Sequence, residues 1–205
     1  MSTYSSPVPV GCRYTSGYGN RTLGGRVSFH AGSDYAPPKP GQTGVKLYAI
    51  SDGVVLRTGT NIRQGHSGKA LEIDHGMRTG NGSTDRMVTY YGHVKKFFVK
   101  KGERVRAGQL IAEMGRTDNV TNVHVHIGVL ANGRFINPHR WLATKGIDPG
   151  KTRPVEGAVT HTVQSGDTLS KIGKKYGVKW RTIATRNNIK GPRYTIYPGN
   201  KLIIK

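Results

Sequence analysis

Hydrophobic and polar residues alternate in short runs along the first 140 residues of the chain. Clear runs lie at residues 45–50, 54–57, 70–75, 87–94 and 109–114. They are rich in β-branched and aromatic residues and end at turn residues, which is typical of strands joined by hairpins. No segment repeats the strand-helix-strand pattern of a parallel sheet. We therefore predict a mainly β N-terminal domain built from antiparallel sheets.

A further β-branched run, from Val120 to Val129, contains two histidines that flank one valine. In a strand, His124 and His126 would lie on the same face, about 6.6 to 6.8 Å apart. One imidazole could then bind a metal while the other reaches the substrate or a water beside it. The alternative is a pair of histidines on the solvent face of a surface strand, and the pair by itself favours that alternative.

The pattern changes after residue 145. Residues 146–160 are rich in Gly, Pro and Thr and have no periodicity, which predicts a linker. A strand, two helices and a strand are then expected, at residues 161–164, 169–176, 180–187 and 201–204. The sequence thus predicts a first domain over residues 1–145 and a small α+β (βααβ) domain over residues 161–205.

The composition and the net charge of the chain indicate a polyanionic partner. Of the 205 residues, 29 are Gly and 10 are Pro, which suits many short strands and tight turns. The net charge is +21, of which residues 1–148 carry +11 and residues 161–205 carry +9, so no single basic tail explains it. Nucleic acid and an anionic cell-wall surface both fit this charge. We find no zinc-finger spacing, basic zipper or aromatic ribonucleoprotein signature, so we expect no specific nucleic acid.

The single cysteine, Cys12, excludes an intrachain disulfide. It lies in what reads as a turn entering a strand rather than at a helix start, so we interpret it as structural and not as a nucleophile.

The first residues have no signal-peptide pattern, and no stretch is long enough to span a membrane. We therefore expect synthesis in a cytoplasm and another route to any external target.

Three histidine motifs, taken in order, resemble a known family. His30-Ala31-Gly32-Ser33-Asp34 reads as a loop entering a strand, Tyr91-Gly92-His93 follows on a later strand, and His124-Val125-His126 is the pair described above. Together they resemble the lysostaphin-type (LytM-like) zinc metallopeptidases over roughly residues 10–142. Any one of the motifs alone is weak, and the ordered set is far more specific.

The resemblance implies a role for each motif residue. His30, Asp34 and His126 would bind Zn²⁺ and leave a fourth position open for water or the scissile carbonyl. His93 and His124 would be the catalytic pair that takes the proton of the water and stabilises the oxyanion or protonates the leaving amine. Which histidine does which is open. Tyr91 is a candidate for lining the substrate groove, and a packed strand tyrosine is the alternative.

The sequence departs from the family beside the histidine pair. Members usually have a small residue, Gly and Pro before the first histidine and Leu between the two, where this chain has Thr121, Asn122 and Val123 before it and Val125 between. This departure concerns the shape of the substrate groove more than the metal site. The remaining histidines fall outside the family motifs and are interpreted as structural: His66, His75, His139 and His161.

Residues 161–205 resemble a lysin motif (LysM), for example at Val163-Gln164-Ser165-Gly166-Asp167-Thr168-Leu169 and Tyr197-Pro198-Gly199-Asn200. That resemblance implies binding to the N-acetylglucosamine glycan of peptidoglycan. Its sugar contacts would be Gly166, Asp167, Thr168 and Ile196, although several matching positions also serve the core and the turns.

These resemblances imply a peptidoglycan hydrolase: a zinc metalloendopeptidase that cuts the cross-linking peptides, with stem and bridge peptides at the first domain and glycan at the second. Anionic wall polymers would add attraction. We expect a monomer, and a phage endolysin held in the host cytoplasm until lysis is our hypothesis for its origin. The alternatives are a non-enzymatic wall-binding protein on a degenerate peptidase fold and, more distantly, a basic nucleic-acid binder. The peptide bond cut, in a polyglycine bridge or an alanine-diaminopimelate cross-link, is open.

Overall fold

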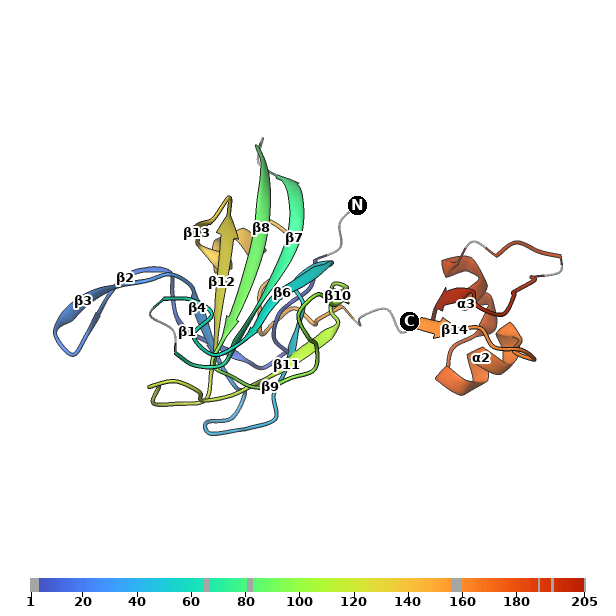
Figure 1. The fold of residues 1–205 in the computed structure, drawn as a ribbon. Helices are drawn as coiled ribbons and strands as arrows, with labels where there is room; N and C mark the ends of the chain where they lie inside the picture. The colour runs from blue at the N-terminus through green and yellow to red at the C-terminus, as the bar shows by residue number, and fades with distance from the viewer. Residues whose placement is uncertain are drawn as a thin grey trace. The chain divides into compact units, whose positions relative to one another are not determined.

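A computed structural model describes residues 4–64, 67–80, 83–155, 160–187, 189–192 and 194–204. The chain divides into two compact units, residues 1–155 and residues 156–205. The first unit is almost entirely antiparallel β structure, and the second is a small α+β unit (Figure 1). The mainly β fold class and the small α+β region predicted from the sequence are confirmed.

An antiparallel eight-stranded sheet forms the framework of the first unit. Its strands are β1 (Arg13–Ser16), β4 (Ser33–Ala36), β6 (Gly53–Gly59), β7 (Ala70–Gly80), β8 (Ser83–Gly92), β10 (Arg104–Val105), β12 (Val125–Ala131) and β13 (Arg134–Ile136). In space their order is β1-β4-β12-β8-β7-β6-β10, and β13 pairs with β12. The N-terminal strand β4 therefore lies beside β12, with β1 on its other side, although about ninety residues separate β4 from β12 in sequence.

Two smaller sheets complete the first unit. One consists of β5 (Lys46–Tyr48), β11 (Leu110–Met114) and β9 (Val94–Phe97), in that order. The other is the hairpin of β2 (Gly19–Leu23) and β3 (Arg26–His30), which extends away from the large sheet (Figure 1). One short helix, α1 (Pro138–Ala143), begins after Asn137, whose side chain accepts a hydrogen bond from the amide of Arg140.

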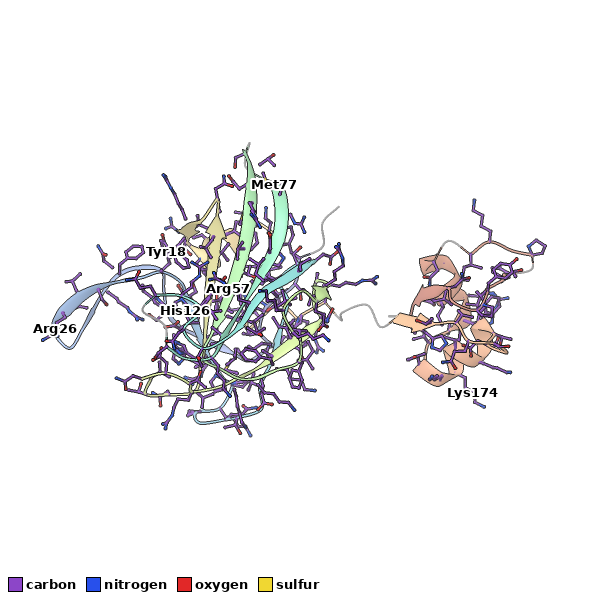
Figure 2. The ribbon with its side chains drawn as sticks, viewed as in Figure 1. Tyr18, Arg26, Arg57, Met77, His126 and Lys174 are labelled. Carbon is purple, nitrogen blue, oxygen red and sulfur yellow. The ribbon has the colours of Figure 1, made fainter. Side chains whose placement is uncertain are left out.

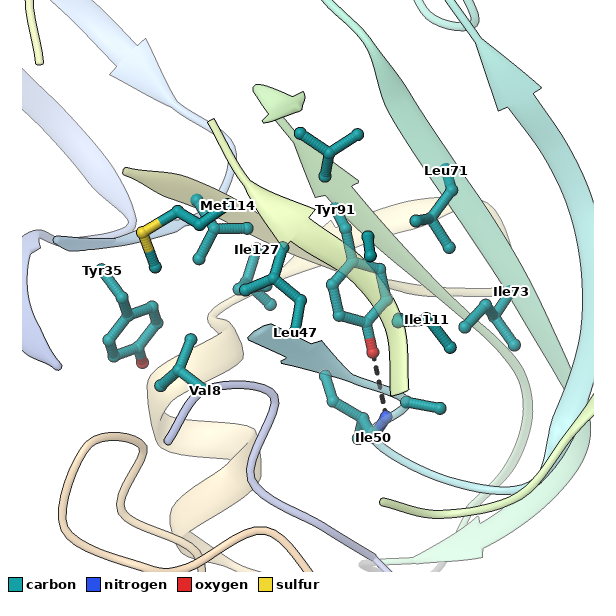
Figure 3. Packing of buried hydrophobic residues seen from close by; sticks show 14 of the residues in the cluster. Val8, Tyr35, Leu47, Ile50, Leu71, Ile73, Tyr91, Ile111, Met114 and Ile127 are labelled. Atoms are coloured by element: carbon teal, nitrogen blue, oxygen red, sulfur yellow. Dashed lines mark hydrogen bonds between the residues drawn. The ribbon is translucent and has the colours of Figure 1, made fainter. Parts of the chain in front are cut away.

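The core of the first unit lies between the large sheet and the β5-β11-β9 sheet (Figure 3). Leu47 and Ile111 come from the smaller sheet, and Tyr91, Val125 and Ile127 come from the large one. Burial of such side chains stabilises the fold by about 1.5 to 3 kcal/mol each. Because strand residues alternate between faces, the valine and isoleucine of β12 that enter this core direct His126 to the opposite face.

Cys12 is buried next to this framework, and burial raises the pKa of its thiol to about 11. A thiol with such a pKa is protonated near neutral pH and is a poor nucleophile. This agrees with the structural interpretation of Cys12.

The first unit extends past the predicted domain boundary at residue 145. Ile147 is buried, the amide of Gly11 donates a hydrogen bond to the carbonyl of Gly150, and the amide of Val155 donates to Ser5 Oγ. Residues 146–155 therefore pack with the first unit and are not a free linker. The Gly, Pro and Thr content and the missing periodicity predicted a linker here, but hydrogen bonds from backbone groups hold residues 146–155 against the first unit.

The second unit contains β14 (Thr160–Thr162), α2 (Leu169–Tyr176), α3 (Trp180–Arg186) and β15 (Lys201–Ile203), in the predicted order. Thr168 caps α2, and Gly177 ends it in the left-handed conformation that glycine adopts most readily. Val163, Leu169, Ile172, Ile183 and Leu202 form its core. Within the described residues, no helix combines the length and the apolar character that a membrane span requires.

Candidate metal centre

Three side chains that are far apart in sequence meet on one face of the large sheet. β4 pairs with β12 in a register that places Asp34 opposite His126, and His30 ends β3 four residues before Asp34. His30 Nε2 lies 3.1 Å from Asp34 Oδ1 and 2.9 Å from His126 Nδ1, and His126 Nδ1 lies 2.9 Å from Asp34 Oδ1. All three residues are buried. Figure 2 labels His126 on its strand, near the base of the β2–β3 hairpin.

These three atoms fit a tetrahedral metal ion. Ligands about 2.0 to 2.1 Å from zinc in tetrahedral geometry are about 3.3 Å from each other, close to the observed separations. Without a cation, two ring nitrogens and a carboxylate oxygen would bring lone pairs together in a buried place. Burial alone would raise the pKa of the Asp34 carboxyl, but the adjacent His126 and His30 outweigh this and hold that pKa well below its ordinary value. The site therefore offers an anionic oxygen and two imidazole nitrogens, with a fourth position open.

Surrounding groups orient the candidate ligands. A carbonyl oxygen can only accept a hydrogen bond, so His30 Nδ1, 2.7 Å from the carbonyl of Gly17, carries the proton and directs the lone pair of Nε2 inward. Arg21 on β2 donates from Nη1 to Asp34 Oδ2 over 3.5 Å and to Ser16 Oγ over 2.8 Å. The two oxygens of Asp34 thus have separate partners, as in metal sites whose carboxylate binds through one oxygen.

A glycine makes room for the site. A Cβ atom on Gly32 would lie 2.4 Å from His126 Nε2 and 2.6 Å from the carbonyl oxygen of Ile127. Any side chain at this position would displace the imidazole or the strand. The glycine between His30 and Asp34 is therefore required by the close approach of the motif to β12.

His93 and His124 lie together beside the three candidate ligands. Their ring centroids are 4.6 Å apart, and the ring centroid of His93 is 6.3 Å from that of His126. His93 Nδ1 donates to the carbonyl of Thr117 over 2.8 Å, and His124 Nδ1 donates to the carbonyl of Asn122 over 2.9 Å. Each ring thus has its Nε2 available as the proton-accepting atom. Burial lowers the pKa of His93, which favours its neutral form.

The structure brings these five predicted residues together, but not on one continuous strand. β12 begins at Val125, and His124 precedes it in an isolated bridge with Gly115. His93 follows β8 with a φ of 60°, a left-handed conformation that turns the chain at the site. Strand alternation therefore predicted the neighbourhood of His124 and His126 but not the loop that carries His124.

Tyr91 does not line a substrate groove, so that prediction is wrong. Its side chain is fully buried in the core, where its hydroxyl accepts a hydrogen bond from the amide of Ile50 and donates one to the carbonyl of Tyr48 (Figure 3). Tyr90, the residue before it, instead faces His126 with ring centroids 5.8 Å apart. Alternation on β8, counted from Gly92 opposite His126, would have selected Tyr90.

The other histidines have structural partners where the structure describes them. His75 bonds to the carbonyl of Asp52 and to Thr89, and His139 bonds to the hydroxyl of Tyr35. His161 bonds to Asp167 and Tyr176 within the second unit. His66 lies outside the described residues.

The second unit has a pocket of about 410 Å³ that includes three of the four predicted sugar contacts. Asp167, Thr168 and Ile196 line it, together with Trp180 and Tyr194, which the sequence interpretation did not select. Gly166, although described, does not line this pocket, because it lies in the turn before α2, where its carbonyl accepts a hydrogen bond from Lys171 Nζ. Two aromatic side chains in an open pocket suit the apolar face of a sugar ring.

Comparisons with known proteins agree with both units. Residues 28–138 match peptidase family M23, and residues 161–205 match the LysM domain. The peptidoglycan DD-endopeptidase ShyA of Vibrio cholerae is 34% identical over 134 residues, which are 64% of this chain and 28% of the relative. The glycyl-glycine endopeptidase ALE-1 of Staphylococcus capitis is 34% identical over 117 residues, 57% of this chain and 28% of the relative.

A solved structure has the same arrangement of the first unit. The crystal structure of a zinc-containing peptidase from Vibrio cholerae superposes with a TM-score of 0.53 at 29% identity, covering 66% of this chain and 39% of that one. The chain thus spans only about a quarter to two fifths of the length of these relatives. The segment that matches the family nevertheless contains all five clustered residues: His30, Asp34, His93, His124 and His126 lie within residues 28–138. The chain therefore belongs to peptidase family M23 and carries a LysM domain.

Proposed function

We propose that this chain is a zinc-dependent endopeptidase that cuts the cross-linking peptides of peptidoglycan and is held on the glycan by its LysM domain. The convergence of His30 Nε2, Asp34 Oδ1 and His126 Nδ1 within 3.1 Å of one another carries this proposal. The relatives named as peptidoglycan and glycyl-glycine endopeptidases support the reaction class. The zinc-containing neighbour supports the choice of metal.

The three clustered residues would hold the ion, and the neighbouring histidines would move protons. When bound, zinc polarises a peptide carbonyl and lowers the pKa of water. His93 and His124 each keep Nδ1–H on a backbone carbonyl, so each exchanges a proton through Nε2. One of them accepts the proton of the attacking water at Nε2, and the other, which must begin the cycle protonated at Nε2, donates that proton to the leaving amine. Burial keeps His93 neutral to a lower pH, so it can begin the cycle as an acceptor.

The test compares the wild type with His126→Ala and with His139→Ala as a control in the same unit. The wild type should bind one zinc ion per chain and clear a suspension of purified cell walls, and His126→Ala should lose both properties. His139→Ala should keep both, because His139 bonds to Tyr35 and not to the metal centre. Equal wall clearance by His126→Ala would refute the zinc mechanism. Zinc binding without any clearance by the wild type would favour a non-enzymatic wall-binding protein.

Origin and assembly stay predictions. A phage endolysin would remain inside the host until membrane disruption and would lyse cells when added from outside. Export of the protein by a host that carries no phage lysis genes would contradict this origin. A monomer is expected, and sedimentation of the purified chain would check it.

A further inference from the structure

A pocket of about 380 Å³ opens beside the metal centre. Asp34 and His124 form part of its lining, so the pocket and the site share a wall. The rest of the lining comes from β1, from Ala36 at the end of β4, from the loop after β4 and from residues 121–123 before β12. A substrate whose scissile bond lies at the metal centre would therefore place neighbouring groups in this pocket.

Strand register places Arg13 on the same face as the metal centre. Arg13 pairs with Ala36 on β4, and Asp34, two residues before Ala36, pairs with His126 on β12. The paired strands end before His124, which reaches the pocket from the segment before β12. Arg13, Ala36 and His124 all line the pocket, so the side chains of Arg13 and His124 face the same space.

The guanidinium of Arg13 is positioned but not neutralised. Its Nε donates to the carbonyl of Pro37 over 3.3 Å, which leaves the two terminal nitrogens for another acceptor. In the described part of the chain, Arg13 forms no ion pair, and it is the one Lys or Arg that lines this pocket. The carboxylate of Asp34 faces His30 and His126 through Oδ1 and Arg21 through Oδ2 instead. An arginine fork of this kind fits a carboxylate through two parallel hydrogen bonds.

We propose that Arg13 binds a carboxylate of the substrate and thereby selects the bond that is cut. The preferred substrate is a cross-linking peptide with a free carboxylate next to the scissile bond, as diaminopimelate supplies, rather than an uncharged polyglycine bridge. This inference rests on the proposed endopeptidase function and specifies its substrate class.

Two soluble cross-linked peptides test it, identical except that the diaminopimelate carboxylate is free in one and amidated in the other. The wild type should cut the free acid with a kcat/KM about tenfold or more above that for the amide. Arg13→Gln should lose this preference through a higher KM for the free acid, with little change for the amide. Arg13→Lys should keep part of the preference. Arg134→Gln, which removes an exposed arginine on β13, should behave like the wild type.

A binding measurement separates this inference from the proposed function. The metal-free wild type should bind the free-acid peptide about tenfold more tightly than Arg13→Gln does, as calorimetry would show, with both proteins unfolding at the same urea concentration. Equal kcat/KM of the wild type for both peptides, or an unchanged preference in Arg13→Gln, would overturn the role of Arg13. If the wild type cuts neither peptide, the proposed function is wrong. The ratio of the dissociation constants of Arg13→Gln and the wild type for the free-acid peptide then tests whether Arg13 binds the carboxylate.

Discussion

His75 is a buried histidine whose surroundings favour the neutral ring. Its Nδ1 donates to the carbonyl of Asp52 over 2.9 Å, and its Nε2 lies 2.8 Å from Thr89 Oγ1. Burial lowers the pKa of His75 from 6.5 to about 4. A neutral imidazole with one donor and one acceptor satisfies both partners. The protonated ring would place a charge in a largely buried position.

This pKa predicts that the first unit loses stability in mild acid. Between pH 6.5 and pH 4 the unfolded chain binds a proton at residue 75 that the folded chain does not, so the free energy of unfolding falls as the pH falls. The contribution is fully present above pH 6.5 and decreases by about 3 kcal/mol by pH 4. Urea unfolding in the presence of a chelator, at pH 7 and pH 5, should show a smaller pH dependence for His75→Gln than for the wild type. The same pH dependence in both would contradict this role.

At the scale of single residues, motif order predicted the three clustered residues better than periodicity did. His30, Asp34 and His126 occupy fixed positions in the family motifs; β4 pairing with β12 places Asp34 opposite His126, and the end of β3 supplies His30. Tyr91 belongs to the same motif as His93, yet its place on β8 directs its side chain to the core. The role of Arg21 depends on a hairpin that brings it back to Asp34, and no short-range pattern contains that contact.

The loop between β11 and β12 holds His93 in place. Its Thr117 carbonyl accepts the hydrogen bond of His93 Nδ1, and the next residue, Asp118, accepts hydrogen bonds from the amide and the hydroxyl of Ser67. The bond from Ser67 lowers the pKa of Asp118 to about 2, so the carboxylate stays ionised near neutral pH. Asp118 therefore ties this loop to the segment before β7.

Removal of that tie should lower catalysis without removing the metal. Asp118→Ala should reduce kcat on a soluble cross-linked peptide about tenfold or more, because the ring of His93 would lose its fixed orientation. Zinc content and KM should stay near their wild-type values. Asp85→Ala is the matched control, since Asp85 also accepts side-chain hydrogen bonds but lies at the far end of β8. A loss of zinc in Asp118→Ala would show that the loop supports the metal site instead.

The sequence pattern predicted elements where a strand has one buried face or a helix has caps. Thr168 and Gly177 bound α2 at the expected residues. The hairpin of β2 and β3 has no such signal, because its hydrophobic residues Val27 and Phe29 are exposed and neither face of the hairpin is buried. Residues 146–155 resembled a linker for a similar reason: they are held by backbone hydrogen bonds, and a composition poor in hydrophobic residues does not reveal these.

At the scale of the whole molecule, the proposed function would have the positive charge and the two units act on the same target, the bacterial cell wall. The positive charge is divided between both units, +11 over residues 1–148 and +9 over residues 161–205. Attraction to an anionic wall therefore does not depend on one unit and should weaken as salt screens it. The pocket of the second unit would add binding that is specific for glycan. Once that unit is bound, cross-links within its reach are presented to the metal centre at a high effective concentration.

This coupling predicts that a substitution in the LysM pocket lowers the activity on insoluble cell walls and leaves the activity on a soluble peptide unchanged. Ile196→Asp places a charge in the wall of the pocket beside Trp180 and Tyr194. On intact cell walls this variant should need about tenfold more protein for the same rate of clearance, because it loses the gain in effective concentration. On a soluble cross-linked peptide its kcat/KM should equal that of the wild type, because the metal centre is unchanged. Tyr197→Asp is the control, since Tyr197 is exposed and lies outside the pocket lining. Equal loss on both substrates would mean that the second unit acts through the catalytic unit rather than through the wall.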